Sequence, residues 1–297
     1  MPPARHLLRA LLTGLCLTFQ IAAAPVAMAQ IGTPTLPGLG ATPPAGSGPS
    51  RIPSHCIALA RDISRVMPAK FGDPLAADSV RIRFVGHATF ALETGGGPFA
   101  ATDFTGELGP ISKRPDVVTM NNAHSTHWTD RPDPEIEHVL RGWTDDGSAA
   151  EHELDLGEML VRNVTTDTRD WSGGVRKDGN SIFIFEVGGL CIGHLGHLHH
   201  EPDALQYASI GRLDVVMVPV DGGYTMAVSE MAKVIRRLRS SVVLPMHWFS
   251  GRSLETFLAD MGKDFDVQRP DAPDLELSLH SLPDRPTIIV LRPSWEP

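Results

Sequence analysis

The sequence Asp116-Val117-Val118-Thr119-Met120-Asn121-Asn122-Ala123-His124-Ser125-Thr126-His127-Trp128 places two histidines directly after a short apolar run. The β-branched residues at 117–119 predict a buried strand, and the small and polar residues that follow predict a loop at its end. His124 and His127 are therefore expected in a loop that a strand positions. Three more histidines follow apolar, strand-like runs further along the chain, namely His194, His197 and His247.

Histidines at several strand ends are typical of a metal site. Neutral imidazole is a good ligand for zinc-like ions, and three such ligands leave one coordination position for water. Any one of these five histidines alone would more simply be a loop or core residue. Together, on loops that strands position, they favour a divalent metal site. We expect zinc, with manganese as an alternative.

The composition is that of a soluble globular protein. The chain has 297 residues, enough for one large domain or two small ones, with 42% hydrophobic and 21% charged residues. The formal net charge of −9 argues against a nucleic-acid partner. We expect a small-molecule substrate, and the sequence does not indicate an oligomeric state.

The first 29 residues have the pattern of an export signal. Arg5 and Arg9 make a basic start, an apolar stretch follows, and Ala27-Met28-Ala29 is a small-x-small cleavage site. A membrane anchor is the weaker interpretation, because the apolar core is short and Pro25 interrupts its end. The pattern predicts cleavage after Ala29, a periplasmic or secreted protein, and no stable membrane anchor in its mature form.

Composition divides the rest of the chain into three parts. Residues 30–53 are rich in Pro and Gly and predict a linker, residues 54–79 predict an N-terminal helical extension with a helix at 57–66, and residues 80–297 form the main domain. Cys56 and Cys191 could pair in an oxidising compartment. The favoured interpretation is two separate thiols, with Cys191 buried in a strand.

Within the main domain, apolar alternation predicts closely spaced strands first and alternating strands and helices later. The early turns are tight, which favours antiparallel pairing there. A short helix is expected at 135–140, a surface loop at 171–180, and a hairpin turn at 188–189. The pattern predicts two sheets with helices packed outside.

Several blocks resemble a known family in their order and spacing. Phe84-Val85-Gly86-His87-Ala88-Thr89-Phe90 is similar to its opening strand–turn–strand. Asn122 to His127 lies where the family has His-x-His-x-Asp-His, His194-Leu195-Gly196-His197 lies where it has His-x-Gly-Asp, and His247 matches its last histidine. Over residues 80–291 the chain thus resembles metallo-β-lactamase-fold proteins, of the branch that includes L-ascorbate-6-phosphate lactonase. The resemblance implies an α+β, four-layer αβ/βα sandwich of two mixed sheets with helices outside.

The departures from the family pattern concern the metal ligands. Asn122 replaces the first histidine of the signature, Thr126 replaces its aspartate, and His197 replaces the bridging aspartate. A bridging carboxylate neutralises charge between two cations, which one imidazole nitrogen cannot do. One ion is therefore favoured over two.

The resemblance implies two half-sites: Asn122 with His124 and His194, and His127 with His197 and His247. We expect one ion on the second set, while His124 and His194 complete a weaker site or contact substrate. The resemblance also implies that Asp103 hydrogen-bonds a ligand. His87 either faces the site or is a turn residue bonded to backbone.

These features predict an exported metal-dependent hydrolase that uses a metal-bound hydroxide on an ester, lactone, amide or phosphoester bond. Thr126, Asn122 or a histidine that does not bind the ion would orient the water in place of the missing aspartate. The alternative is a non-catalytic metal- or ligand-binding descendant of the fold, which the missing carboxylates favour.

Other residues near these blocks carry weaker expectations. Asp221 is interpreted as a turn former, with a replacement ligand as the alternative. His199 and His200 are expected to be exposed. Trp128 and Trp248 could either wall a pocket or belong to the core.

Overall fold

The loop that carries His124 and His127 leaves the end of β4, a strand inside a six-stranded sheet. A computed structural model describes residues 56, 71–170 and 172–295 and gives this sheet the order β13-β1-β2-β3-β4-β5. The first three strands of the chain pair antiparallel, as the tight turns predict, whereas β3, β4 and β5 are parallel. The strands are β1 (Ser79–Gly86), β2 (Thr89–Thr94), β3 (Phe99–Thr102), β4 (Val117–Met120), β5 (His138–Arg141) and β13 (Asp274–Ser278).

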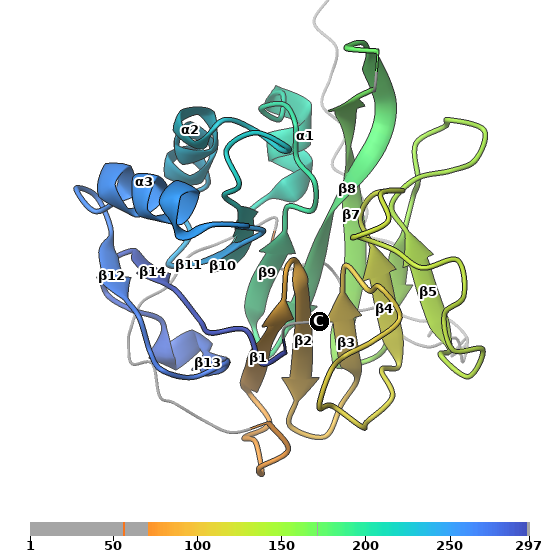
Figure 1. Cartoon of the computed structure of the whole chain (residues 1–297). Helices are drawn as coiled ribbons and strands as arrows, with labels where there is room; N and C mark the ends of the chain where they lie inside the picture. Colours follow the sequence, from red (N-terminus) through yellow and green to blue (C-terminus); the bar gives the residue numbers. More distant parts are fainter. Residues whose placement is uncertain (1–55, 57–70, 171, 296–297) are drawn as a thin grey trace, which may run out of the picture. The chain divides into compact units, whose positions relative to one another are not determined.

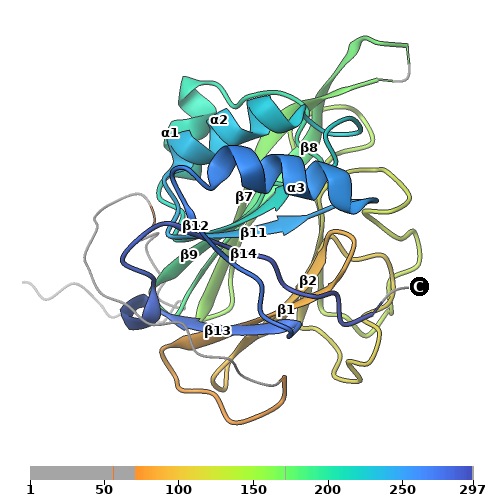
Figure 2. The same cartoon turned by 60° about the vertical axis from the view of Figure 1, so that its left-hand side comes forward.

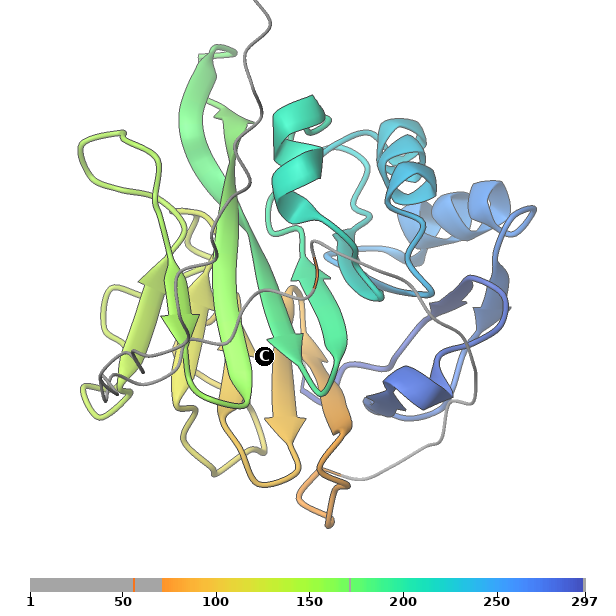
Figure 3. The same ribbon diagram turned by 180° about the vertical axis from the view of Figure 1, so that it is seen from behind.

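A second sheet of eight strands has the order β12-β14-β11-β10-β9-β8-β7-β6. The strands from β9 to β12 in this order are parallel, and those from β6 to β9 are antiparallel. They are β6 (Glu153–Asp155), β7 (Met159–Arg169), β8 (Val175–Val187), β9 (Leu190–His194), β10 (Val215–Pro219), β11 (Val242–Met246), β12 (Asp266–Gln268) and β14 (Thr287–Ile289). Figure 3 shows the long β7–β8 ribbon from behind.

Three helices lie along one face of the eight-stranded sheet, and the six-stranded sheet packs on its other face (Figures 1 and 2). They are α1 (Ala204–Ile210), α2 (Val228–Leu238) and α3 (Gly251–Met261), and a 3₁₀ turn, η1 (Leu279–Ser281), follows β13. Alternation along each strand supplies both layers: Val215 and Met217 face the other sheet, whereas Val216 and Val218 face the helices. Because strand β10 is buried on both faces, its sequence is a continuous apolar run.

This architecture confirms the predicted α+β sandwich of two mixed sheets with helices outside. In the described part of the chain, the outer face of the six-stranded sheet is covered by loops, whose apolar side chains include Phe104, Leu108 and Ile136. No helix among the described residues is long and apolar enough to cross a membrane. The described residues all belong to one compact unit. The predicted export signal, linker and helix at 57–66 lie outside the described residues.

Two local predictions are wrong. Residues 135–140 do not form a helix: the chain turns and then enters β5, which pairs in parallel with β4 from Val117 opposite His138 onward. Residues 171–180 are not wholly a loop, because β8 begins at Val175 and pairs with the end of β7. In both places pairing with a neighbouring strand outweighs the local sequence preference.

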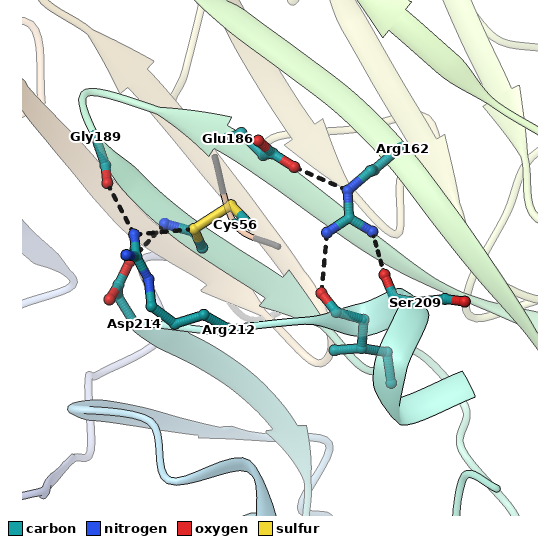
Figure 4. Close-up of a disulfide and its surroundings, with 9 residues drawn as sticks. Cys56, Arg162, Glu186, Gly189, Ser209, Arg212 and Asp214 are labelled. Carbon is teal, nitrogen blue, oxygen red and sulfur yellow. Dashed lines mark hydrogen bonds and ion pairs between the residues drawn. A yellow bond between two sulfur atoms is a disulfide. The ribbon is translucent and has the colours of Figure 1, made fainter. Parts of the chain in front are cut away.

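The interpretation of two separate thiols is also wrong. Cys56 and Cys191 form a disulfide with a Cα–Cα distance of 5.7 Å, and both residues are buried (Figure 4). Cys191 does lie in a buried strand, β9, as expected. The backbone carbonyl of Cys56 accepts a hydrogen bond of 2.8 Å from the N–H of Arg212. The disulfide thus attaches the chain at position 56 to β9, a strand in the interior of the eight-stranded sheet. The two cysteines are 135 residues apart, and their spacing in the sequence could not reveal that they pair.

The histidine-bearing loops meet because of strand direction. Strands β9, β10 and β11 are parallel, so their carboxyl ends lie at one edge of the sheet. His194 ends β9, Asp221 follows β10, and His247 follows β11. The loop after β4 reaches the same edge, where Asn122 forms an isolated bridge with Asn180 of β8.

Candidate metal site

Two histidines from different sheets face one another at this edge. The Nε2 atoms of His127 and His247 are 3.1 Å apart, and the two rings lie nearly parallel with their centroids 5.0 Å apart. Both side chains are buried. The two residues are 120 positions apart in the chain.

A carboxylate lies behind each of these imidazoles. Asp103 accepts a hydrogen bond from Nδ1 of His127, and Asp221 accepts one from Nδ1 of His247 at 2.9 Å. Burial raises the pKa of Asp103 to about 6. Burial alone would also raise the pKa of Asp221, but hydrogen bonds from His247, Thr225 and nearby backbone N–H groups hold it below its ordinary range. Both acids are therefore ionised at neutral pH and accept the Nδ1 protons.

For His127 it follows that Nε2 presents a lone pair toward His247. Burial, and then the neighbouring His247, lower the pKa of His127 well below its ordinary value, so this imidazole is neutral. The Nε2 atom of His247 lies 3.1 Å from this lone pair, a separation that a proton or a cation shared by the two nitrogens would stabilise. A histidine whose far nitrogen donates to a carboxylate is also the usual arrangement of a metal ligand.

His87 adds a third nitrogen to the cluster. Its Nε2 is buried and has no hydrogen-bond partner among the described residues. Burial, and then His247 and His127, lower its pKa to about 3. One nitrogen from each of His87, His127 and His247 lies within 4.8 Å of the other two, and no other such group of His, Cys, Asp or Glu occurs among the described residues. Three clustered imidazoles, one of them with a nitrogen that has no partner among the described residues, fit a zinc-like cation.

The backbone around this cluster is unusual. His87, Asp103 and His247 have φ angles of 51°, 48° and 58°, in the left-handed region that non-glycine residues rarely adopt. The N–H of His247 also donates to the carbonyl of His87 at 2.7 Å, which joins the β1–β2 turn to the end of β11. Such strained positions gather at functional sites, and here three of them hold or support the facing nitrogens.

His197 lies beside the cluster but is held differently. Its ring centroid is 4.7 Å from that of His127, and its backbone N–H donates to Asn180 Oδ1 at 2.7 Å. Its Nδ1 is 2.8 Å from Nε2 of His199, so it faces another imidazole and not a carboxylate. His199 is half-buried, which corrects the expectation that it is an exposed loop residue.

Of the other predicted site residues, His124 and Asn122 line the cavity described below, whereas His194 does not. His124 stacks on His197 with the ring centroids 5.5 Å apart, and its Nδ1 is 3.0 Å from the hydroxyl of Thr126. Asn122 donates its amide to the carbonyl of Gly179 at 2.6 Å. His194, by contrast, is fully buried, and both its ring nitrogens bond to backbone, at Ala88 and Gly196.

A cavity of about 540 Å³ opens over His197 and His247. Its lining includes Asn122, His124 and Thr126, together with two aromatic rings. Those rings are Tyr224 and Phe249, which are 70% and 63% exposed although large and apolar. Sequence reasoning gave neither ring a role, nor Arg169 and Arg176, which also line the cavity.

The two tryptophans next to site histidines do not line this cavity. Trp128 packs edge-on against Trp143, and Trp248 packs on Phe84 of the core between the sheets. Asp221 forms its expected turn, accepting N–H groups of residues 223–225 through Oδ1, and it orients His247 through Oδ2.

Comparison with known proteins assigns the family. The beta-lactamase superfamily domain matches residues 81–247, more than half of the chain. The chain therefore belongs to the metallo-β-lactamase superfamily.

Curated relatives and a solved structure agree. The UPF0173 metal-dependent hydrolase of Thermococcus kodakarensis is 24% identical over 241 residues, which cover 73% of this chain and 98% of the relative. Its counterpart from Pyrococcus abyssi is 26% identical over 192 residues, which cover 57% and 84%. A crystal structure from Thermotoga maritima, provisionally described as a zinc-dependent hydrolase of this superfamily, matches with a TM-score of 0.52 and 27% identity over 71% of this chain and 98% of that one.

Proposed function

We propose that this chain is a metal-dependent hydrolase whose ion is held by His127 and His247, with His87 as the third ligand. The observation that carries the proposal is the pair of Nε2 atoms 3.1 Å apart, each on a ring whose Nδ1 bonds to a carboxylate. A divalent ion bound there would activate a water molecule and polarise the oxygen of a scissile bond.

We propose zinc, and one ion per chain. Imidazole ligands suit zinc, whereas manganese prefers oxygen ligands. The two carboxylates nearest the cluster, Asp103 and Asp221, already bond to Nδ1 atoms of its histidines. Neither acid is therefore free to bridge a second ion. His87 here takes the third position that sequence analysis assigned to His197.

The remaining predicted residues would act around the ion. Thr126 and His124 line the cavity as a bonded pair, which supports a role in orienting water or substrate. Asn122 also lines the cavity, with its amide nitrogen anchored to the carbonyl of Gly179, and its amide oxygen would accept a hydrogen bond from water or substrate. His194 would support the site from behind, since binding an ion would require it to give up a backbone hydrogen bond.

The cavity volume of about 540 Å³ suits a small molecule. We propose an ester, lactone, amide or phosphoester substrate. The blocks around His87 and His247 also favour the branch that includes L-ascorbate-6-phosphate lactonase. An exported, periplasmic or secreted protein remains our proposal, and the Cys56–Cys191 disulfide supports it because such bonds persist in oxidising compartments.

Metal analysis of the purified protein tests this proposal directly. We expect one zinc per chain in the wild type, and loss of that zinc together with any hydrolysis in His247→Ala. His280→Gln, in the 3₁₀ turn η1, is the matched control and should retain both. A wild type without bound metal, or a fully loaded His247→Ala, would contradict the assignment.

A screen of generic esters, lactones and phosphodiesters then separates the two function classes. Zinc-dependent turnover of any of them supports a hydrolase. Stoichiometric zinc with no turnover supports the non-catalytic alternative, which Thr126→Asp with His197→Asp would test by a gain of hydrolysis.

A further inference from the structure

The histidines at this site differ in where they carry their proton. In His127 and His247 the proton is on Nδ1, where a carboxylate accepts it. His197 bonds to no carboxylate among the residues that the structure describes. Its Nδ1 faces Nε2 of His199 at 2.8 Å, so the proton between them belongs to one ring or the other.

The backbone of Arg169 decides which ring holds that proton. The N–H of Arg169 donates to Nδ1 of His199 at 2.6 Å, so this nitrogen is an acceptor and carries no proton. A neutral His199 must then carry its proton on Nε2, which donates it to Nδ1 of His197. A neutral His197 must in turn carry its own proton on Nε2. Burial first, and then Arg169, lower the pKa of His199 to about 4, consistent with a neutral ring.

The hydrogen-bond chain from Arg169 through His199 to His197, called the relay below, is anchored at both ends. The guanidinium of Arg169 donates to the carbonyls of Gly223, Tyr224 and Thr225 at 2.9, 2.9 and 2.6 Å, in the loop that also carries Asp221. At the other end, Asn180 accepts the backbone N–H of His197. The proton arrangement is therefore built into well-anchored backbone.

The Nε2–H of His197 is available to donate to a molecule bound in the cavity. His197 lines the cavity together with His247, and its Nε2 bonds to none of the described residues. An N–H group beside a metal cluster can donate to an oxygen on which negative charge develops as a bond is broken. It cannot at the same time offer a lone pair to an ion.

We propose that His197 is a hydrogen-bond donor to the substrate oxygen that becomes negatively charged during hydrolysis, and not a metal ligand, with His199 as the residue that positions its proton. This inference rests on the proposed function. The substrate class it implies is one with an acyl or phosphoryl oxygen at the scissile centre.

Nuclear magnetic resonance of the ¹⁵N-histidine-labelled, metal-free protein tests the proton positions without any activity. We expect the Nε2–H form for His197 and the Nδ1–H form for His127 and His247, each signal being assigned by its loss in the corresponding His→Gln variant. An Nδ1–H form for His197 would overturn the proposal.

Metal content separates this proposal from the proposed function. We expect His197→Leu to keep one zinc per chain while kcat falls about 100-fold, the size seen when such a donor is removed, with little change in KM. His197→Gln, which restores an N–H donor, should recover part of kcat. If zinc is lost in both variants as in His247→Ala, His197 is a ligand and the inference fails. If zinc is retained in His247→Ala, the proposed function fails.

His199 provides a second, independent pair of variants. In His199→Phe the relay is broken, so we expect the His197 signals to show a mixture of both proton positions and kcat to fall. His199→Gln can still donate to His197 and should restore the Nε2–H form. An unchanged His197 spectrum in His199→Phe would show that the relay does not set the proton.

Discussion

The surroundings of the two ends of strand β9 differ in whether their buried polar groups have partners. Near its start, charges are matched: Arg162 bonds to Glu186 at 2.8 Å and to two backbone carbonyls, and Arg212 bonds to Asp214 at 3.1 Å beside the disulfide (Figure 4). Past its other end, the Nε2 atoms of His127 and His247 face one another at 3.1 Å, and the Nε2 of His87 has no partner among the described residues. One end is built to be stable, and the other keeps unmatched nitrogens that a ligand can satisfy.

The largest effect should come from removing the bridge at the stable end. In the double variant Cys56→Ala/Cys191→Ala, we expect about 4 kcal/mol lower free energy of unfolding, because a loop of 135 residues is no longer closed. Urea unfolding measures this. Zinc content of the folded fraction should not change, and a parallel loss of zinc would show that the two ends are coupled.

Breaking the buried ion pair at the same end should cost somewhat less. We expect Glu186→Gln to lower the free energy of unfolding by about 3 kcal/mol, since Arg162 would keep its charge without a carboxylate in a buried site. Thermal unfolding of the metal-free protein reports it. The exposed pair partner Glu255→Gln is the control and should change stability by less than about 1 kcal/mol.

At the other end, a change to a supporting carboxylate should act on the metal. Asp221→Asn keeps the turn's size but weakens the acceptor for Nδ1 of His247. We expect zinc affinity to fall about 10- to 100-fold, measured by competition with a chelator. Unaltered affinity would mean that Asp221 serves the turn alone.

The smallest effect on stability should come from the exposed cavity wall. Tyr224→Ala removes a ring that is 70% exposed, so we expect a change in unfolding free energy within about 0.5 kcal/mol. If the cavity holds substrate, KM for an active generic substrate should rise several-fold while zinc content stays constant. A rise in KM without stability loss would sharpen the contrast between the two ends.

Sequence predicted the parts of the fold that local patterns encode. Alternation identified most strands, and the paired glycines at 188–189 identified the β8–β9 hairpin. The segment 135–140 misled because Ile136, Val139 and Leu140 have helical spacing, whereas pairing with β4 decides its structure. Strands β12 and β13 were not predicted, since both are short and partly polar, and β13 pairs with a strand distant in the chain, β1.

For the site, sequence could supply residue types but not their surroundings. The strand-end pattern brought out five histidines, of which the structure gathers His124, His127, His197 and His247. The proton position on each ring depends on partners far along the chain, such as Asp221 for His247 and Arg169 for His199. No local pattern encodes such pairings, and the same holds for the disulfide.

The backbone bond from His247 to the carbonyl of His87 has a mechanical consequence. His87 and His127 belong to loops of the six-stranded sheet, whereas His247 ends a strand of the eight-stranded sheet. An ion bound by all three histidines would cross-link the two sheets. Metal binding would then also stabilise the packing of one sheet on the other.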